Sequence, residues 1–379
     1  MWQLLQIGDT LQTFDEYVLK CFEESTSIEL SPSAKEQAQL SAANGGLGLR
    51  SLNLHSPAAF ISSVALSGAE WDISSSIDLY NNRVKETSKL HFSTESQIPG
   101  KWKSQKRLSE EIEKQLLRQL LESTSSQSDR ARLLEVSSRS VNASKWITAV
   151  PSPGLGNKFE PDEAQVLFKH RLGLPLASPG KTCTMCPDKA LDPHGHHALT
   201  CKKGPDVVSR HNFLRNTIFN YARNAQMSPV LEQGANLDQA GTLTRPADVL
   251  IPLWSLGKAG AIDVTVAHPL NPLTIEGASA TPGYCLEVAE TRKHAANEAK
   301  CRDLGWKCLA VAFTPYGTIG EEGKLVLKRI ASRLAIQNRC KPSSAHNELV
   351  TRVGVILARC TARAILARTP RCSVELVCS

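Results

Sequence analysis

The stretch from Arg245 to Ala267 reads RPADVLIPLWSLGKAGAIDVTVA and holds two short apolar runs that each carry one aspartate. The first run contains Asp248 and the second contains Asp263. Both runs are rich in β-branched residues, and proline and glycine stand between them, which predicts two neighbouring strands joined by a tight connection. Paired strands would bring the two carboxylates together, and a divalent cation is a common partner for two buried aspartates. The stretch therefore predicts a metal site on a sheet.

The segments around this stretch alternate between helical and strand patterns. Apolar residues recur at helical spacing over residues 205–226, and the alanine-bearing segment 287–304 is also expected to be a helix. Short strands are expected at 230–232 and 307–313. Residues 268–283 are rich in Pro, Gly and Ser and are expected to form a loop. The order helix, strand, strand, strand, helix, strand, helix predicts an α/β core with a mixed sheet.

A cluster of cysteines and histidines precedes this core. The pattern Cys-x2-Cys-x9-His-x4-Cys is formed by Cys183, Cys186, His196 and Cys201. It fits a closed Cys3His zinc site, and because no open ligand position is implied, we expect the zinc to be structural. His194 and His197 compete with His196 for the histidine position, so the spacing leaves that ligand open.

Composition indicates an ordinary folded protein. The chain has 379 residues, 41% of them hydrophobic and 21% charged, which is enough for two or three domains. No apolar run reaches the roughly 18 residues of a membrane span, and the N-terminus lacks the pattern of a signal peptide. We therefore expect a soluble intracellular protein, in which the eleven cysteines are reduced and a clustered subset binds metal.

Positive charge is concentrated at the C-terminal end. Residues 324–379 contain eleven Lys or Arg against two acids, a surplus of nine, whereas the whole chain carries +7. Within residues 347–368, Arg352, Arg359 and Arg363 share one helical face. This face predicts contact with an anionic polymer such as nucleic acid, and a merely solvated helix face is an equally open interpretation.

The paired aspartates within this order of elements resemble the PD-(D/E)XK nuclease fold in its restriction-like endonuclease form. A version preceded by a Cys-x2-Cys…His-x4-Cys knuckle occurs at the C-terminus of LINE-type (non-LTR) retrotransposon proteins, behind the reverse transcriptase. Residues 45–51, GGLGLRS, resemble the segment just beyond the polymerase core of such proteins. The chain thus resembles the C-terminal region of a LINE-type protein.

The resemblance implies roles for single residues. Asp248 and Asp263 match the two acids that bind catalytic Mg²⁺, and Glu232 resembles an additional acid before them. Thr265 stands where the family has a lysine, so the lysine is expected from the next helix, as Lys300 or as Lys293 seven residues earlier. Arg245, beside the first aspartate, is expected to contact nucleic acid together with the arginines of the C-terminal helix.

The resemblance also implies a domain plan and a function. The plan has a helical remnant of the polymerase thumb or connector (1–95), a helical linker (96–145), a helix with the zinc knuckle (146–204), the restriction-like endonuclease core (205–340) and a basic C-terminal helix (341–379). The implied activity is Mg²⁺-dependent nicking of DNA in the nucleus, with the element's RNA as a further candidate partner. No Tyr/Phe-x-Asp-Asp sequence is present, so polymerase activity is not expected.

Other interpretations stay open. The chain fits a zinc-stabilised nucleic-acid-binding protein whose nuclease fold has lost its chemistry, or a fragment of a decayed element. The aspartates alone would also fit a purely structural role, in which they cap strand ends or pair with Arg245 and Lys258.

Overall fold

The computed structural model describes residues 2–67, 74–84, 104–137, 143–232, 234 and 246–369. The chain forms two compact units, residues 1–125 and residues 126–379. This division falls inside the segment expected to be a helical linker. The other expected domain boundaries stay predictions.

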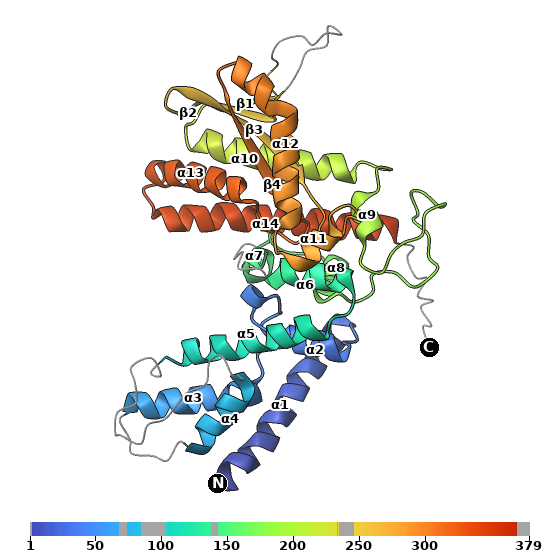
Figure 1. The fold of residues 1–379 in the computed structure, drawn as a ribbon, viewed down its shortest axis with the longest axis vertical. Coiled ribbons are helices and arrows are strands. Elements are labelled where there is room, and N and C mark those ends of the chain that lie inside the picture. The colour runs from blue at the N-terminus through green and yellow to red at the C-terminus, as the bar shows by residue number, and fades with distance from the viewer. Residues whose placement is uncertain are drawn as a thin grey trace. The chain divides into compact units, whose positions relative to one another are not determined.

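The first unit is built from helices, shown in blue to teal in Figure 1. Its elements are α1 (Trp2–Thr26), α2 (Pro32–Gln39), the 3-10 helix η1 (Ala42–Asn44), α3 (Leu52–Ser67), α4 (Ser74–Val84) and α5 (Gln105–Ser123). Its core lies between α3, α4 and α5, around the buried Ile61, Tyr80 and Ile112. The glycine-rich loop after η1 packs back onto α2, and a Cβ on Gly46 would lie 2.0 Å from the carbonyl oxygen of Leu40. Only glycine allows this close approach of two backbones.

The second unit combines helices with one sheet. Its helices are α6 (Gln127–Ser137), α7 (Lys145–Thr148), α8 (Pro161–Leu172), α9 (His196–Thr200), α10 (Asp206–Asn224), α11 (Ile275–Ala280), α12 (Tyr284–Asp303), α13 (Glu321–Gln337) and α14 (Pro342–Arg368). Its strands are β1 (Val230–Leu231), β2 (Val249–Ser255), β3 (Lys258–Val266) and β4 (Lys307–Phe313). Within the described residues, no helix is both long enough and apolar enough to span a membrane.

The sheet is mixed, as the sequence predicts. Its strand order is β1-β2-β3-β4, with β1, β2 and β3 antiparallel to one another and β4 parallel to β3. The predicted sequence of elements from α10 to α13 is confirmed, with one difference. The segment 268–283, expected to be a loop throughout, contains the short helix α11.

The two aspartate strands form the tight hairpin that the sequence predicts. β2 continues through Pro252 to Ser255, and β3 begins at Lys258, so only Leu256 and Gly257 connect them. Both connecting residues have positive φ, 49° and 76°, as a two-residue turn of this hand requires. The pairing shifts register between Ile251 and Ser255, around Pro252, because proline has no N–H to offer the ladder.

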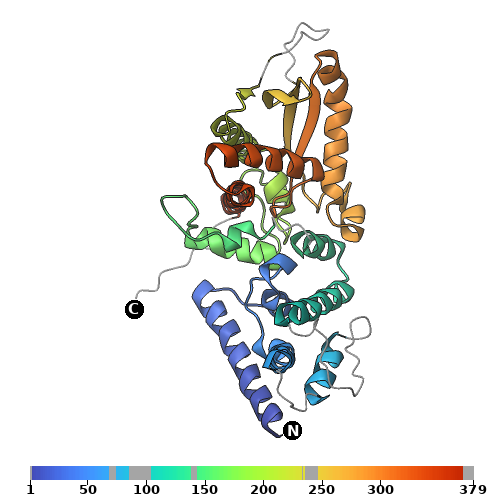
Figure 2. The ribbon, with the colours of Figure 1, turned by 90° about the vertical axis from the view of Figure 1, so that its left-hand side faces the viewer.

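Helices cover both faces of the sheet (Figures 1 and 2). α10, α13 and α14 form the main core with one face, around the buried Ile262, Val264 and Val311. α12 packs on the other face, where Ala289 meets Ala312 and Cys301 meets Ala261. Side chains alternate between the faces of a strand, so residue 263, between Ile262 and Val264, points toward α12. This alternation places the second aspartate beneath a helix.

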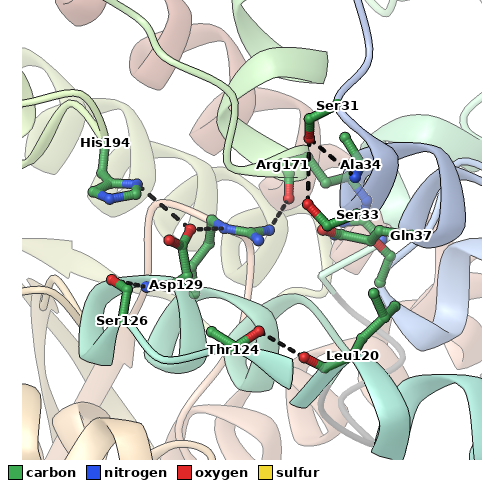
Figure 3. A network of polar contacts seen from close by, with 12 residues as sticks. Ser31, Ser33, Ala34, Gln37, Leu120, Thr124, Ser126, Asp129, Arg171 and His194 are labelled. Atoms are coloured by element: carbon green, nitrogen blue, oxygen red, sulfur yellow. Dashed lines mark hydrogen bonds and ion pairs between the residues drawn. The ribbon is translucent and has the colours of Figure 1, made fainter. Parts of the chain in front are cut away.

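A polar network joins α6 to α8 in the second unit (Figure 3). Arg132 donates from Nη1 to the carbonyl of Arg171 at 2.5 Å, and its Nε lies 3.6 Å from Asp129. Asp129 also lies 3.8 Å from Nδ1 of His194. Arg132 is buried, so these contacts offset part of the cost of removing its charge from water.

His170 of α8 is buried beside this network and stacks on Tyr316, with ring centroids 4.3 Å apart and planes 3° apart. Burial, and next the positive charge of Arg132, lower the pKa of His170 to about 3. The folded state therefore holds the imidazole neutral, whereas the unfolded chain protonates it near pH 6.5. The contribution of His170 to the free energy of unfolding is complete above pH 6.5 and is lost as the pH falls toward 3.

We expect the free energy of unfolding to fall between pH 7.5 and pH 5, with His170 contributing about 2 kcal/mol of the loss. His170→Phe keeps an aromatic ring on Tyr316 and removes the titrating group. Urea unfolding at both pH values should therefore show a smaller decrease in the variant than in the parent. Equal decreases in the two proteins would contradict this role of His170.

Candidate metal centres

Asp248 and Asp263 come together on the sheet. Asp248 directly precedes β2, where its backbone N–H donates to the carbonyl of Ile262 at 2.9 Å, and Asp263 lies within β3. The two carboxyl groups are close enough for each to shift the pKa of the other. Both side chains are largely buried, with exposed fractions of 19% and 9%. The pairing of carboxylates expected from the sequence is therefore present.

Asp248 is held by its own sheet and by α10. One carboxylate oxygen accepts from the backbone N–H of Val264 at 2.7 Å, and the other lies 3.2 Å from Nε2 of His211. Burial alone would raise the pKa of Asp248, but the hydrogen bonds from His211 and Val264 outweigh it, and the pKa is lowered. Asp248 is therefore the more acidic member of the pair.

Asp263 is held by α12. Lys293 donates from Nζ to one oxygen at 2.8 Å, and Asn297 donates from Nδ2 to the other at 2.7 Å. Burial raises the pKa of Asp263, Lys293 opposes this effect, and the neighbouring Asp248 adds to it, so the pKa is raised overall. Two neighbouring acids with opposite pKa shifts form an electrostatically strained pair that a cation would relieve.

The structure distinguishes the two lysines proposed from the sequence. Lys293 contacts Asp263, whereas Lys300 is exposed near the end of α12. The two residues share a helix face, but seven residues separate them by about 10 Å along the helix axis. Thr265 lies two residues after Asp263 on β3, so the positive charge beside Asp263 comes from α12 and not from β3.

Glu232 lies at the end of β1, where its backbone N–H donates to the carbonyl of Asp248 at 2.9 Å. Its carboxylate forms an ion pair with Arg215 of α10. Arg215 follows His211 by one helical turn, so one face of α10 contacts both Asp248 and Glu232. The backbone of Glu232 thus lies next to that of Asp248, whereas its carboxylate pairs with Arg215 of α10.

The second centre is formed by three cysteines and a histidine. The ligand atoms of Cys183, Cys186, His197 and Cys201 all lie within 4.8 Å of one another. Among the described residues, no other group of three or more His, Cys, Asp or Glu side chains gathers in this way. The set of donors, soft thiolates with one imidazole, is the kind that suits zinc.

The histidine of this group is His197, which corrects the expected His196. His197 and Cys201 are four residues apart in and just after α9, and the Cys201 N–H donates to the His197 carbonyl at 2.8 Å. Residues four apart share a helix face, whereas His196 is five residues from Cys201 and is turned about 140° away. The ring of His196 instead meets His268 edge to face, with centroids 4.9 Å apart.

Surrounding groups hold the cluster in place. One carboxylate, Asp192, accepts from the backbone N–H groups of His196 and His197, at 2.9 and 2.7 Å. Arg368, at the end of α14, is fully buried and donates to Asp206 and to the carbonyl of Lys203. Burial alone would raise the pKa of the Cys201 thiol, but Arg368, together with hydrogen bonds to Lys203 and Cys186, outweighs it and lowers that pKa. A lowered thiol pKa favours the thiolate that binds metal.

The three arginines expected to meet nucleic acid are engaged within the protein. Arg352 donates to the carbonyl of Leu155 at 2.8 Å, and Arg359 donates to that of Gly156 at 2.8 Å. Arg363 donates to the carboxylate of Glu163 at 2.9 Å. These contacts fasten the loop before α8 and the first turn of α8 to α14. Contact of these arginines with nucleic acid stays a prediction. Arg245 lies outside the described residues.

Sequence reasoning missed His211, Asn297 and Arg368 as parts of the two centres. Asn297 could have been found, because it follows Lys293 by four residues and so shares its helix face. His211 and Arg368 reach their partners only through tertiary packing, at sequence separations of 37 and 162 residues from Asp248 and Asp206 respectively. Local spacing contains no information about such contacts.

Comparison with models of known protein families and with curated proteins returns no match for this chain.

Proposed function

We propose that the second unit is a Mg²⁺-dependent endonuclease that nicks DNA, with Asp248 and Asp263 as its metal-binding acids. The observation that carries the proposal is the cluster of these two buried carboxylates with Lys293 and His211. Burying two neighbouring acids costs folding free energy, so their presence favours a functional role over a structural one. The order of elements around the mixed sheet agrees with the restriction-like endonuclease core that the sequence resembles.

The donor set fits magnesium. Each oxygen of Asp248 and Asp263 takes one hydrogen bond in this structure and keeps acceptor capacity for a cation. Mg²⁺ usually keeps several waters and is bound by one or two carboxylates, so a complete protein cage is not required. Bound there, the ion would stabilise charge on the phosphate oxygens and lower the pKa of the attacking water.

The protein groups around the acids have separate tasks in this proposal. Lys293 keeps a positive charge beside Asp263, where it stabilises negative charge as it develops on the phosphate. His211 and the N–H of Val264 fix the orientation of Asp248 and keep it ionised. Asn297 fixes the orientation of Asp263 in the same way.

We further propose that Cys183, Cys186, His197 and Cys201 hold one structural Zn²⁺. Four protein ligands complete a tetrahedral site and leave no position for a substrate. The buried Arg368 and the carboxylate of Asp192 are the outer groups that keep the ligands oriented. The zinc would tie residues 183–201 to the end of α14, where Thr184 donates to the carbonyl of Ala367 at 2.7 Å.

The wider assignment is also a proposal and rests on the sequence resemblance. In it the chain is the C-terminal region of a LINE-type retrotransposon protein, the first unit is a remnant of the polymerase thumb or connector, and the protein acts in the nucleus on DNA, with the element's RNA as a further candidate partner.

The test is a nicking assay with the full chain and supercoiled plasmid. We expect relaxed circles to accumulate when Mg²⁺ is present and none when Mg²⁺ is omitted. Plasmid that stays supercoiled in Mg²⁺, with protein shown to be folded and zinc-loaded, would rule out the endonuclease. If such protein still bound DNA in a salt-dependent manner, the rival function, a zinc-stabilised nucleic-acid-binding protein, would be favoured.

The two lysines of α12 provide a sharper test of the site. We expect Lys293→Met to lower the nicking rate about 100-fold, since removing one positioned donor to a developing charge has an effect of this order. Lys300→Met, the matched control on the same helix face, should change the rate less than threefold. Single-turnover nicking measures both, and a larger effect for Lys300→Met would reverse the assignment.

A further inference from the structure

A pocket of about 390 Å³ lies at the end of β3 and is lined by residues of both α10 and α12. Its floor is apolar and is formed by Val266, Ala267, Val288 and Ala289. A volume of this size is typical of sites for small ligands or for single units of a polymer.

The charged side chains that line the pocket are cationic. Lys202, Arg210 and Arg292 line it, and no Asp or Glu is among the described residues that do. Lys202 and Arg292 are exposed, and within the described part of the chain neither forms an ion pair. An apolar floor under unpaired cations suits a ligand that has both a flat apolar part and a negative charge.

The pocket and the carboxylates lie along the same two helices. On α10, Arg210 lines the pocket and the next residue, His211, contacts Asp248. On α12, Val288 and Arg292 line the pocket, and Lys293 and Asn297 contact Asp263. Neighbouring residues of both helices therefore line the pocket and contact the acids. A strand of nucleic acid that crosses the acids would reach the pocket with a neighbouring nucleotide.

We propose that this pocket binds one nucleotide of a nucleic-acid strand, with Arg292 and Lys202 contacting its phosphate and the apolar floor packing against its sugar and base. The proposal depends on the proposed endonuclease only for where the cleaved bond lies. Lys202 directly follows the zinc-cluster residue Cys201, so the pocket also joins the cysteine cluster to the nuclease core.

The experiment measures binding of a fluorescein-labelled single-stranded DNA 20-mer to the full chain without added Mg²⁺. We expect Arg292→Ala to weaken binding about tenfold, as the loss of one charge-assisted contact does. The slope of log affinity against log salt should fall by about 0.7, the value for one phosphate of a single strand. Val288→Trp fills the pocket without changing charge and should weaken binding to a similar extent.

Arg333→Ala is the matched control, because Arg333 is an exposed arginine on α13 that does not line the pocket. It should leave the affinity within twofold of the parent. If Arg292→Ala, Val288→Trp and Arg333→Ala all bound the 20-mer with equal affinity, the proposal that this pocket binds a nucleotide would be contradicted. Binding of dAMP as tight as that of the 20-mer would also overturn it, because the site would then take a free nucleotide.

The nicking assay separates this proposal from the proposed function. If the parent nicks plasmid while Arg292→Ala and Val288→Trp bind the 20-mer like Arg333→Ala, the endonuclease proposal stands and the pocket proposal is contradicted. If the parent does not nick plasmid but Arg292→Ala and Val288→Trp weaken binding of the 20-mer, the pocket proposal stands and the endonuclease proposal is contradicted.

Discussion

Asp248→Asn and Asp263→Asn are each expected to lower the rate of Mg²⁺-dependent nicking by at least about 1,000-fold. Each change removes one of two anionic ligands, and losing a metal-binding acid raises the activation free energy by several kcal/mol, where about 4 kcal/mol corresponds to 1,000-fold. Asparagine keeps the shape of aspartate and an acceptor for the N–H of Val264 or the amide of Asn297. The fold should therefore survive.

The measurement is single-turnover nicking of supercoiled plasmid, beside thermal unfolding of each variant. Asp303→Asn is the matched control, because Asp303 is an exposed aspartate at the end of α12. It should nick at the rate of the parent. If either site variant nicked within tenfold of the parent while folded, the carboxylates would not be metal ligands, and the structural interpretation of the pair would be preferred.

The purified chain is expected to contain about one equivalent of zinc, which His197→Ala removes and His196→Ala does not. A ligand at 100 times its dissociation constant stabilises the folded state by about 2.7 kcal/mol, so losing the zinc should lower Tm by roughly 5–10 °C. Metal analysis and thermal unfolding measure both effects. Cys183→Ser should behave as His197→Ala does.

His196→Ala is an informative control, because it changes a neighbouring histidine of the same loop and leaves the four ligand atoms in place. It removes the edge-to-face contact with His268 and should lower stability without lowering zinc content. If His196→Ala lost the zinc and His197→Ala retained it, His196 would be the zinc ligand, as the sequence spacing predicts.

The sequence by itself determined the order of elements from α10 to α13, the mixed sheet and the pairing of Asp248 with Asp263. These features follow from local information. Period-two and helical patterns mark each element, and a strand hairpin brings its two halves together whatever the rest of the chain does. The spacing of the cysteines is equally local, because a two-residue gap allows two thiolates to reach one ion.

Only the tertiary structure decided which lysine reaches Asp263, that His211 holds Asp248, and that the arginines of α14 fasten a loop. A sequence pattern specifies the face of a helix on which a residue lies. How the helix packs decides which point along its axis meets the sheet. Lys293 and Lys300 lie about 10 Å apart along that axis, and packing places Lys293 beside Asp263. Asp263 therefore selects its partner through packing contacts that span the unit, which no local spacing encodes.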